Sequence, residues 1–386
     1  MIRKILRILL KAFLILLIPV IIAGCQVLQT IGEKPGPEEI ARYEQLSYFK
    51  EGAFQNPMVL PFYPDRITGA GPQNWWRFLW FLLSNPNAPQ TTLPLVALDA
   101  SSFTAAPAEL AFYWLGHSSL IIELDGLRFL VDPVLGNAAP LPGFVRRYVD
   151  APIQRKDLPP VDYVLITHDH YDHLEYATMR ALRKRPETHF VMPYGVAAHF
   201  RKWGVPEERI HEIGWGESFQ AGKVRVVSER TLHFSGRTFQ RNTSLWSAYV
   251  LQGEKSRLFI SGDSGYGDHF ADIGARHGPF DLAFIEIDAW NPGWPNTHMF
   301  PEEVIRACHD IGAKTLIPVH WGVFDLARHP WDESIRMIRT LVNQDGTIHL
   351  MTPKMGEKVI PGETQTQDWW VLQTATEKPS DPADGD

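Results

Sequence analysis

The stretch that decides the fold is residues 167–174, which read THDHYDHL. It follows an apolar run at residues 161–166 that predicts a short buried strand, so the polar cluster begins where a strand ends. Such loops often carry functional residues on α/β scaffolds. Imidazole and carboxylate groups are ligands for zinc, manganese or iron. A histidine-rich surface loop is the alternative, but three histidines and two aspartates in this short stretch favour a metal site.

The spacing within this stretch suggests how its side chains divide between two metals. In extended backbone, His168 and His170 point the same way, so both can bind one cation. Asp172 and His173 follow where the chain must turn, and they can face a second cation. Asp169 lies between these ligands and is a candidate for handling a proton during catalysis.

Three further candidate ligands follow apolar strand patterns later in the chain. His233 lies in a loop after the strand predicted at residues 224–228 and is the third candidate for the first metal. Asp263 is flanked by small residues that allow close backbone approach, and its carboxylate can bridge two cations. His320 ends the strand predicted at residues 315–319 and completes the second site.

The 167–174 stretch resembles the signature of the metallo-β-lactamase superfamily. That resemblance implies an α/β fold, a four-layer αβ/βα metallo-β-lactamase sandwich, with a one- or two-metal hydrolase site. Local matches at residues 114–119, 235–237, 262–266 and 320–322 resemble N-acylphosphatidylethanolamine-hydrolysing phospholipase D and its bacterial relatives. This resemblance places His168, His170 and His233 on one metal. It places Asp172, His173 and His320 on the other, with Asp263 as the bridge.

The same resemblance makes His298, which precedes Pro301, a pocket histidine near the bond that is cleaved. Asp169, His298 and Asp263 are therefore the candidate catalytic residues, and the sequence does not choose between Asp169 and His298 for the proton. Residues 287–292 depart from the pattern of this branch, which leaves the substrate open. His117 either supports a metal ligand or lines the pocket, or it is an ordinary buried histidine. Asp132 either orients a ligand or ends a strand.

The chain has 386 residues with 45% apolar and 21% charged side chains, ordinary values for a globular protein. Its net charge of -7, and the absence of a long basic run, disfavour nucleic acid as a partner. Cys25 and Cys308 are the only cysteines, which excludes a disulfide framework.

The N-terminus carries a targeting pattern. Basic residues precede a short apolar run that ends Ile22-Ala23-Gly24-Cys25, which resembles a bacterial lipobox. We expect residues 1–24 to be a signal peptide and Cys25 to carry lipid. The expected location is the cell envelope, at the periplasmic face of the outer membrane. An uncleaved anchor in the inner membrane is the alternative.

The remaining boundaries follow from composition. Residues 25–105 form an N-terminal extension, 106–362 the hydrolase domain and 363–386 a loose polar tail. Within the extension, residues 75–83 predict an apolar helix that either packs on the domain or forms a wall facing membrane or substrate.

These features predict a membrane-anchored hydrolase with two divalent metal ions, zinc first and manganese or iron as alternatives. Two cations activate a bridging water for attack on phosphorus or carbonyl carbon, and they stabilise charge on oxygen. The favoured reaction is phospholipase D-type hydrolysis of a phospholipid phosphodiester. The alternatives are hydrolysis of an ester, lactone or lactam at the same site, and a non-catalytic envelope lipoprotein that binds metal. The sequence does not determine the oligomeric state.

Overall fold

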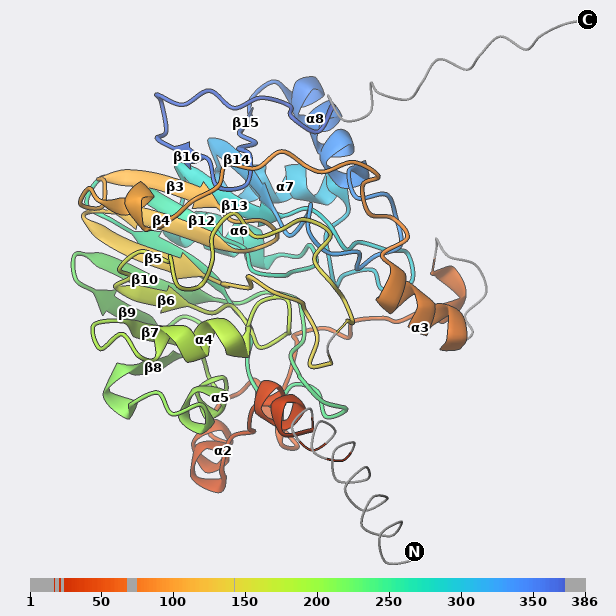
Figure 1. The fold of residues 1–386 in the computed structure, drawn as a ribbon, viewed down its shortest axis with the longest axis vertical. Helices are drawn as coiled ribbons and strands as arrows, with labels where there is room; N and C mark the ends of the chain where they lie inside the picture. Colours follow the sequence, from red (N-terminus) through yellow and green to blue (C-terminus); the bar gives the residue numbers. More distant parts are fainter. Residues whose placement is uncertain (1–16, 18–20, 22–23, 68–74, 142, 372–386) are drawn as a thin grey trace, which may run out of the picture.

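The computed structural model describes residues 17, 21, 24–67, 75–141 and 143–371. Within this part of the chain, two seven-stranded mixed sheets pack against each other, and helices cover their outer faces (Figure 1). This arrangement confirms the predicted four-layer αβ/βα sandwich.

The first sheet is parallel from β5 to β8 and antiparallel elsewhere. Its strands, in spatial order, are β16 (Lys358–Val359), β3 (Leu110–Trp114), β4 (Leu120–Leu124), β5 (Leu127–Val131), β6 (Tyr163–Leu165), β7 (His189–Pro193) and β8 (Ile210–Ile213). The second sheet is parallel from β12 to β15 and antiparallel from β9 to β12. Its strands, in spatial order, are β15 (His349–Leu350), β14 (Thr315–Val319), β13 (Leu282–Glu286), β12 (Arg257–Ile260), β11 (Ala248–Gln252), β10 (Val224–Glu229) and β9 (Ser218–Ala221).

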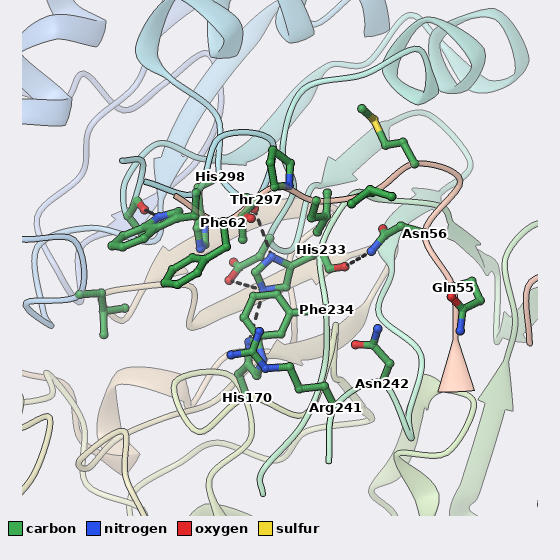
Figure 2. Close-up of a pocket in the computed structure, with 18 of the residues that line it drawn as sticks. Gln55, Asn56, Phe62, His170, His233, Phe234, Arg241, Asn242, Thr297 and His298 are labelled. Carbon is green, nitrogen blue, oxygen red and sulfur yellow. Dashed lines mark hydrogen bonds and ion pairs between the residues drawn. The ribbon is translucent and has the colours of Figure 1, made fainter. Parts of the chain in front are cut away.

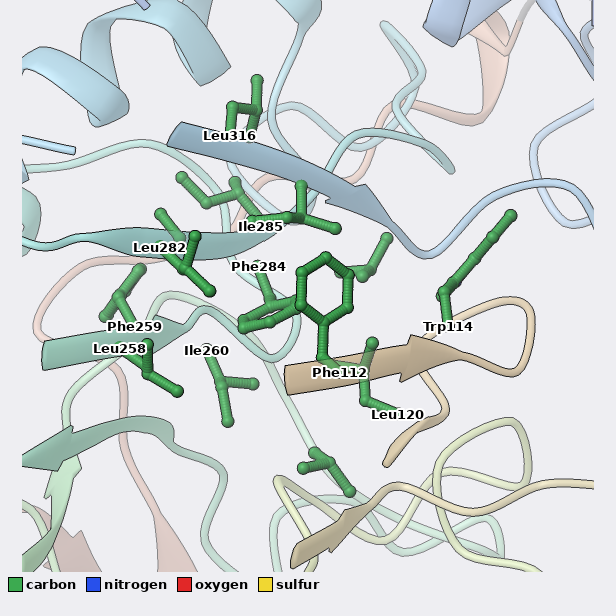
Figure 3. Close-up of a cluster of buried hydrophobic side chains, with 14 of the residues drawn as sticks. Phe112, Trp114, Leu120, Leu258, Phe259, Ile260, Leu282, Phe284, Ile285 and Leu316 are labelled. Carbon is green, nitrogen blue, oxygen red and sulfur yellow. The ribbon is translucent and has the colours of Figure 1, made fainter. Parts of the chain in front are cut away.

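The central strands are apolar on both faces because each sheet is covered on both sides. In β4, Leu120 and Ile122 point between the sheets, whereas Ile121 points to the opposite face. Between the sheets, the rings of Phe112 and Phe284 meet edge to face, with centroids 5.1 Å apart. Figure 3 shows this cluster, to which both sheets contribute. The period-two alternation of side chains thus builds two apolar layers from one strand.

Helices on the outer faces complete the sandwich. The first sheet is covered by α4 (Tyr176–Leu182) and α5 (Ala197–Lys202), and the second by α6 (His269–His277), α7 (Pro301–Ile311) and α8 (Glu333–Asp345). Local signals set the limits of α7. Pro301 occupies the first turn, the Glu303 carboxylate accepts the Phe300 N–H at 3.0 Å, and Gly312 ends the helix at φ +67°.

The N-terminal extension packs against the domain through short elements and irregular segments. These elements are α2 (Pro37–Tyr43), β1 (Phe49–Lys50), β2 (Ala53–Phe54), η1 (Pro64–Arg66), α3 (Trp75–Ser84) and η2 (Ala100–Phe103), and a further 3₁₀ turn, η3 (Glu207–Arg209), precedes β8. Tyr43, Phe49 and Phe54 form a small apolar cluster with Leu245 and Trp246 of the domain. The extension is therefore integrated with the hydrolase domain.

The predicted helix at residues 75–83 is present as α3. Trp80 and Leu83 on this helix are exposed, whereas Phe81 is buried. Most of the predicted signal segment, residues 1–24, lies outside the described residues. In the described part of the chain, no helix has the length and apolar character needed to cross a bilayer.

The prediction that the chain forms a loose tail from Glu363 is wrong for residues 363–371. Trp369 and Trp370 are buried, and Trp369 stacks on Trp321 with ring centroids 5.4 Å apart. The indole N–H of Trp369 donates to the Pro353 carbonyl at 3.1 Å. Two adjacent tryptophans supply enough apolar area to hold an otherwise polar segment on the core.

We therefore predict that Trp369→Ala destabilises the fold by about 3–5 kcal/mol, because the substitution leaves a large cavity and an unpaired carbonyl. Val371→Ala, at an exposed side chain two positions later, is the matched control and should change stability by less than about 0.5 kcal/mol. Chemical denaturation measures both effects. A small, equal effect for the two variants would mean that the tail contributes little to the core.

Candidate metal centre

The predicted ligands converge at one edge of the sandwich, where strands from both sheets end. The His168–His173 loop follows β6, and the segment with His233 follows β10. Asp263 follows β12 and His320 follows β14. Carboxyl ends of neighbouring parallel strands meet at the same edge of a sheet, which brings together residues far apart in the chain.

The first cluster contains three imidazoles and one carboxylate. His170 Nδ1 lies 2.9 Å from His168 Nε2 and 3.3 Å from His233 Nε2. Asp263 Oδ2 lies 3.7 Å from His168 Nε2 and 3.5 Å from His233 Nε2. Four potential ligand atoms therefore face one small volume.

The second cluster lies on the other side of Asp263. His320 Nε2 is 3.1 Å from Asp263 Oδ2 and 3.5 Å from Asp172 Oδ2. His173 Nε2 is 3.3 Å from Asp263 Oδ1 and 3.6 Å from Asp172 Oδ2. His117 Nε2 joins this group at 3.0 Å from Asp172 Oδ2. Asp263 thus touches both clusters, as a bridging carboxylate must.

The spacing and chemistry of these atoms fit divalent metal ions. Atoms bound about 2 Å from a shared cation lie roughly 3–3.5 Å apart, close to the separations observed. Three buried atoms that face the centre, His173 Nε2, Asp263 Oδ1 and His320 Nε2, have no hydrogen-bond partner among the described residues. Buried polar atoms rarely remain unpaired, so their convergence indicates a site that a cation completes.

The electrostatics of the two clusters also favour cations. Burial lowers the pKa of His168 and His233 well below the ordinary value, which keeps both imidazoles in the neutral, metal-binding form. Burial also opposes charge on His320, but the Asp263 and Asp172 carboxylates outweigh it and raise the pKa of His320 to about 10. The second cluster therefore has a negative field that a bound cation neutralises.

Hydrogen bonds from outside the centre orient two of the imidazoles. Asp132 Oδ2 lies 2.8 Å from His173 Nδ1 and also accepts the Thr167 hydroxyl at 2.6 Å. The Thr297 carbonyl lies 3.1 Å from His233 Nδ1. Each contact engages the outer ring nitrogen, so Nε2 is left to face the centre. The structure thus favours the orienting role for Asp132.

Gly262, the small residue beside Asp263, lies where the packing leaves no space for a side chain. Gly262 has φ +55°, and a Cβ there would lie 2.8 Å from the Ser247 carbonyl oxygen and 3.0 Å from Thr167 Cβ. Only glycine tolerates both that conformation and that approach. The backbone next to Asp263 therefore packs directly against the metal-binding loop.

Asp169 is placed differently from the other residues of its motif. Its carboxylate is buried, accepts the Gly236 N–H at 2.7 Å and the Ser244 hydroxyl at 2.8 Å, and lies 3.2 Å from His199 Nε2. It does not line the cavity described below. This geometry favours a role in holding the loop over the proton-handling role considered from sequence.

Arg237 holds the metal-binding loop from behind. Its Nη1 donates to the carbonyls of Asp169 and Leu174, at 2.6 and 2.8 Å. On its other side, the guanidinium donates to the Thr30 and Ile31 carbonyls of the N-terminal segment, at 2.8 and 3.1 Å. One buried cation thus joins both ends of the loop to the segment that follows Cys25.

The centre opens into a cavity of about 780 Å³, a size typical of small-molecule sites. His170, Asp172, His233, Asp263, His298 and His320 form its polar floor. Figure 2 shows Phe62, Phe234 and His298 around His233. One wall is the apolar segment 57–62 of the extension, in which Val59 and Phe62 are 85% and 62% exposed, so this wall reaches the surface.

The extension is fixed to this wall by specific contacts. Asn56 Nδ2 donates to the His233 carbonyl at 2.6 Å, and the Tyr63 N–H donates to the Gly293 carbonyl at 2.6 Å. The helix predicted at residues 75–83 is the apolar segment that sequence reasoning considered for the substrate, but its described side chains do not line the cavity. The apolar wall is therefore formed by residues 57–62.

Sequence reasoning did not identify Glu286 as part of the site. Glu286 ends β13, is fully buried, and places Oε2 3.3 Å from His298 Nδ1. The available signal was a lone acid at the end of an otherwise apolar strand. His298 lines the cavity, as the pocket role predicted for it requires.

Comparison with known proteins places these features in a family. A family model for the β-lactamase superfamily domain matches residues 127–321. An uncharacterised protein of Mycobacterium tuberculosis is 37% identical over 335 residues, covering 85% of this chain and 88% of that protein. N-acyl-phosphatidylethanolamine-hydrolyzing phospholipase D 1 of Caenorhabditis elegans is 32% identical over 259 residues, covering 64% of this chain and 72% of that protein.

The fold also resembles that of an isothiocyanate hydrolase from gut bacteria of Delia radicum. The TM-score is 0.53 at 19% sequence identity, over 65% of this chain and 98% of that structure. This likeness concerns the fold alone. Together with the match of the superfamily domain and the convergent histidine and aspartate clusters, it leads to one conclusion. The chain belongs to the β-lactamase superfamily and is a metal-dependent hydrolase with the metallo-β-lactamase fold.

Proposed function

We propose that this hydrolase cleaves the phosphodiester bond of a glycerophospholipid on the alcohol side, releasing phosphatidic acid. The observation that carries the proposal is the position of Asp263 between two ligand clusters, on the floor of a cavity with an apolar wall. Paired sites suit phosphoryl transfer because both the attacking and the leaving oxygen can be stabilised. The similarity to the nematode phospholipase D supports the same substrate class.

Seven residues of the site are proposed to bind the metal ions. His168, His170 and His233 are proposed to hold the first cation, and the second is proposed to bind His173, Asp172 and His320, with Asp263 common to both. When bound, two divalent cations, zinc in our proposal, supply Lewis-acid activation of water and neutralise charge on the phosphoryl group.

The wall formed by residues 57–62 is proposed to contact the acyl-glycerol part of the substrate. Val59 and Phe62 are largely exposed at this wall, and Met58 is partly exposed. Apolar contact there places the glycerol backbone of a lipid near the polar floor, because acyl chains and phosphate are adjacent in the molecule. Arg241, the only arginine or lysine among the described residues of the cavity lining, supplies a charge that complements phosphate.

We also propose that Cys25 carries a lipid that anchors the protein at the periplasmic face of the outer membrane. Cys25 is exposed and is followed within a few residues by the segment that Arg237 holds. An anchor at this position keeps the cavity close to a surface rich in phospholipid, which raises the local substrate concentration.

The metal assignment predicts distinct effects for three substitutions. Asp263→Ala should deplete both sites, Asp172→Ala mainly the second, and His233→Ala mainly the first, because each removes a ligand from the corresponding cluster. Elemental analysis of purified protein gives the metal-to-protein ratio, which should be about two for the wild type. Glu123→Gln, at a buried carboxylate bonded to Arg128, is the matched control and should keep both metals. Two metals and full activity in Asp263→Ala would contradict the shared ligand.

The substrate proposal predicts which product acquires oxygen from water. Metal-loaded protein incubated with phosphatidylethanolamine vesicles, with and without an N-acyl chain on the headgroup, should release phosphatidic acid and the free alcohol. In ¹⁸O-labelled water the label should enter phosphatidic acid, because water attacks phosphorus. Asp263→Ala should abolish the reaction. If the protein hydrolyses lactones or thioesters but cleaves no phosphodiester, the proposed reaction is wrong and the protein is an ester hydrolase.

The anchor proposal predicts the chemical state of the mature N-terminus. Mass spectrometry of protein isolated from bacterial membranes should find an acylated Cys25 as the first residue, since the Ile22-Ala23-Gly24-Cys25 pattern places the cleavage there. Cys25→Ser should remain uncleaved and unacylated. Wild-type protein that retains residues 1–24 would rule out the lipobox interpretation.

A further inference from the structure

Glu286 is an unusual residue for its place in the fold. It ends a strand whose other residues are apolar, and its side chain is fully buried. Oε1 accepts the Met299 N–H at 3.1 Å, and Oε2 lies 3.3 Å from His298 Nδ1. An isolated buried carboxylate is costly, so a neighbour that shares or donates a proton stabilises it.

His298 connects this carboxylate to the reaction site. It lines the cavity, and its ring centroid lies 5.1 Å from that of His233 and 5.2 Å from that of His320. One ring nitrogen lies within 4.8 Å of potential ligand atoms of Asp263 and His320. Because Nδ1 faces Glu286, Nε2 is the nitrogen left for a group bound in the cavity.

We propose that Glu286 is a positioning residue that fixes the ring of His298 so that His298 Nε2 protonates the departing alcohol. A carboxylate on Nδ1 sets the tautomer and the orientation of an imidazole. This inference rests on the proposed hydrolysis and assigns the proton transfer within it. It selects His298 over Asp169, whose carboxylate is engaged away from the cavity.

The step balances in atoms and electrons. Water adds oxygen to phosphorus, the bond between phosphorus and the alcohol oxygen breaks, and the electron pair remains on that oxygen. The oxygen takes the proton from His298 Nε2, while Nδ1–H stays bonded to Glu286. A proton released from the attacking water then restores His298. One water is consumed, and one alcohol and one phosphomonoester form.

The test compares leaving groups, because only a poor leaving group needs a proton as it departs. Metal-loaded wild type and Glu286→Gln are assayed on two methyl phosphodiesters, one with an alkyl and one with a 4-nitrophenyl leaving group. We expect Glu286→Gln to lower kcat on the alkyl ester about 100-fold, the scale of general acid catalysis, and on the nitrophenyl ester less than about 3-fold. KM and metal content should stay at wild-type values.

Glu123→Gln serves as the matched control, because Glu123 is equally buried but bonds Arg128 near the β4–β5 turn, away from the cavity. It should leave both rates unchanged. An equal loss on both esters, or no loss, would overturn the positioning role of Glu286. A drop in metal content would instead place His298 among the metal ligands and would equally overturn it.

The same experiment separates failure of the inference from failure of the proposed function. If wild type cleaves neither phosphodiester but cleaves carboxylic esters, the proposed function fails, and the comparison is repeated on an alkyl and a 4-nitrophenyl ester of one acid. A selective loss on the alkyl ester then retains the role of Glu286. Equal losses on the two carboxylic esters would rule out the positioning role of Glu286 in ester hydrolysis as well.

Discussion

The structure depends on one electrostatic constraint, the burial of several imidazoles and carboxylates at the joint edge of two sheets. Asp263 lies within 3.7 Å of ring nitrogens of His168, His173, His233 and His320. Such groups are stable in a low-dielectric interior only when opposite charges or hydrogen bonds compensate their desolvation. Bound cations would provide that compensation, so that the fold and the metal centre would stabilise each other.

Much of this arrangement was predictable from sequence because its signals are local. The run Thr315–Val319 is apolar on both faces, and it was predicted as the strand that the structure contains. The edge strands β8 and β9 were not predicted, because both contain polar residues and their apolar signal is weak. The packed tail was missed for another reason, since the polar residues before Trp369 dominate the local composition.

The parts of the site that sequence reasoning missed are those created by tertiary contacts. No spacing rule connects Glu286 with His298, because a loop and not a regular element separates them. Likewise, the contact between Asn56 and the His233 carbonyl joins residues far apart in the chain. Motifs therefore predict which residues bind metal, whereas the cavity walls and the partners of catalytic groups require the folded structure.

The N-terminal segment links the proposed anchor to the chemistry. Trp203, Arg237 and Lys202 donate to successive carbonyls of residues 29–32, and Arg237 also holds both ends of the metal-binding loop. A buried guanidinium without these acceptors would carry a large desolvation cost, so loss of the segment would loosen the loop as well. The segment after Cys25 therefore supports the metal-binding loop through Arg237. In the proposed anchoring, a lipid on Cys25 would act on the orientation of the cavity as well as on its distance from the membrane.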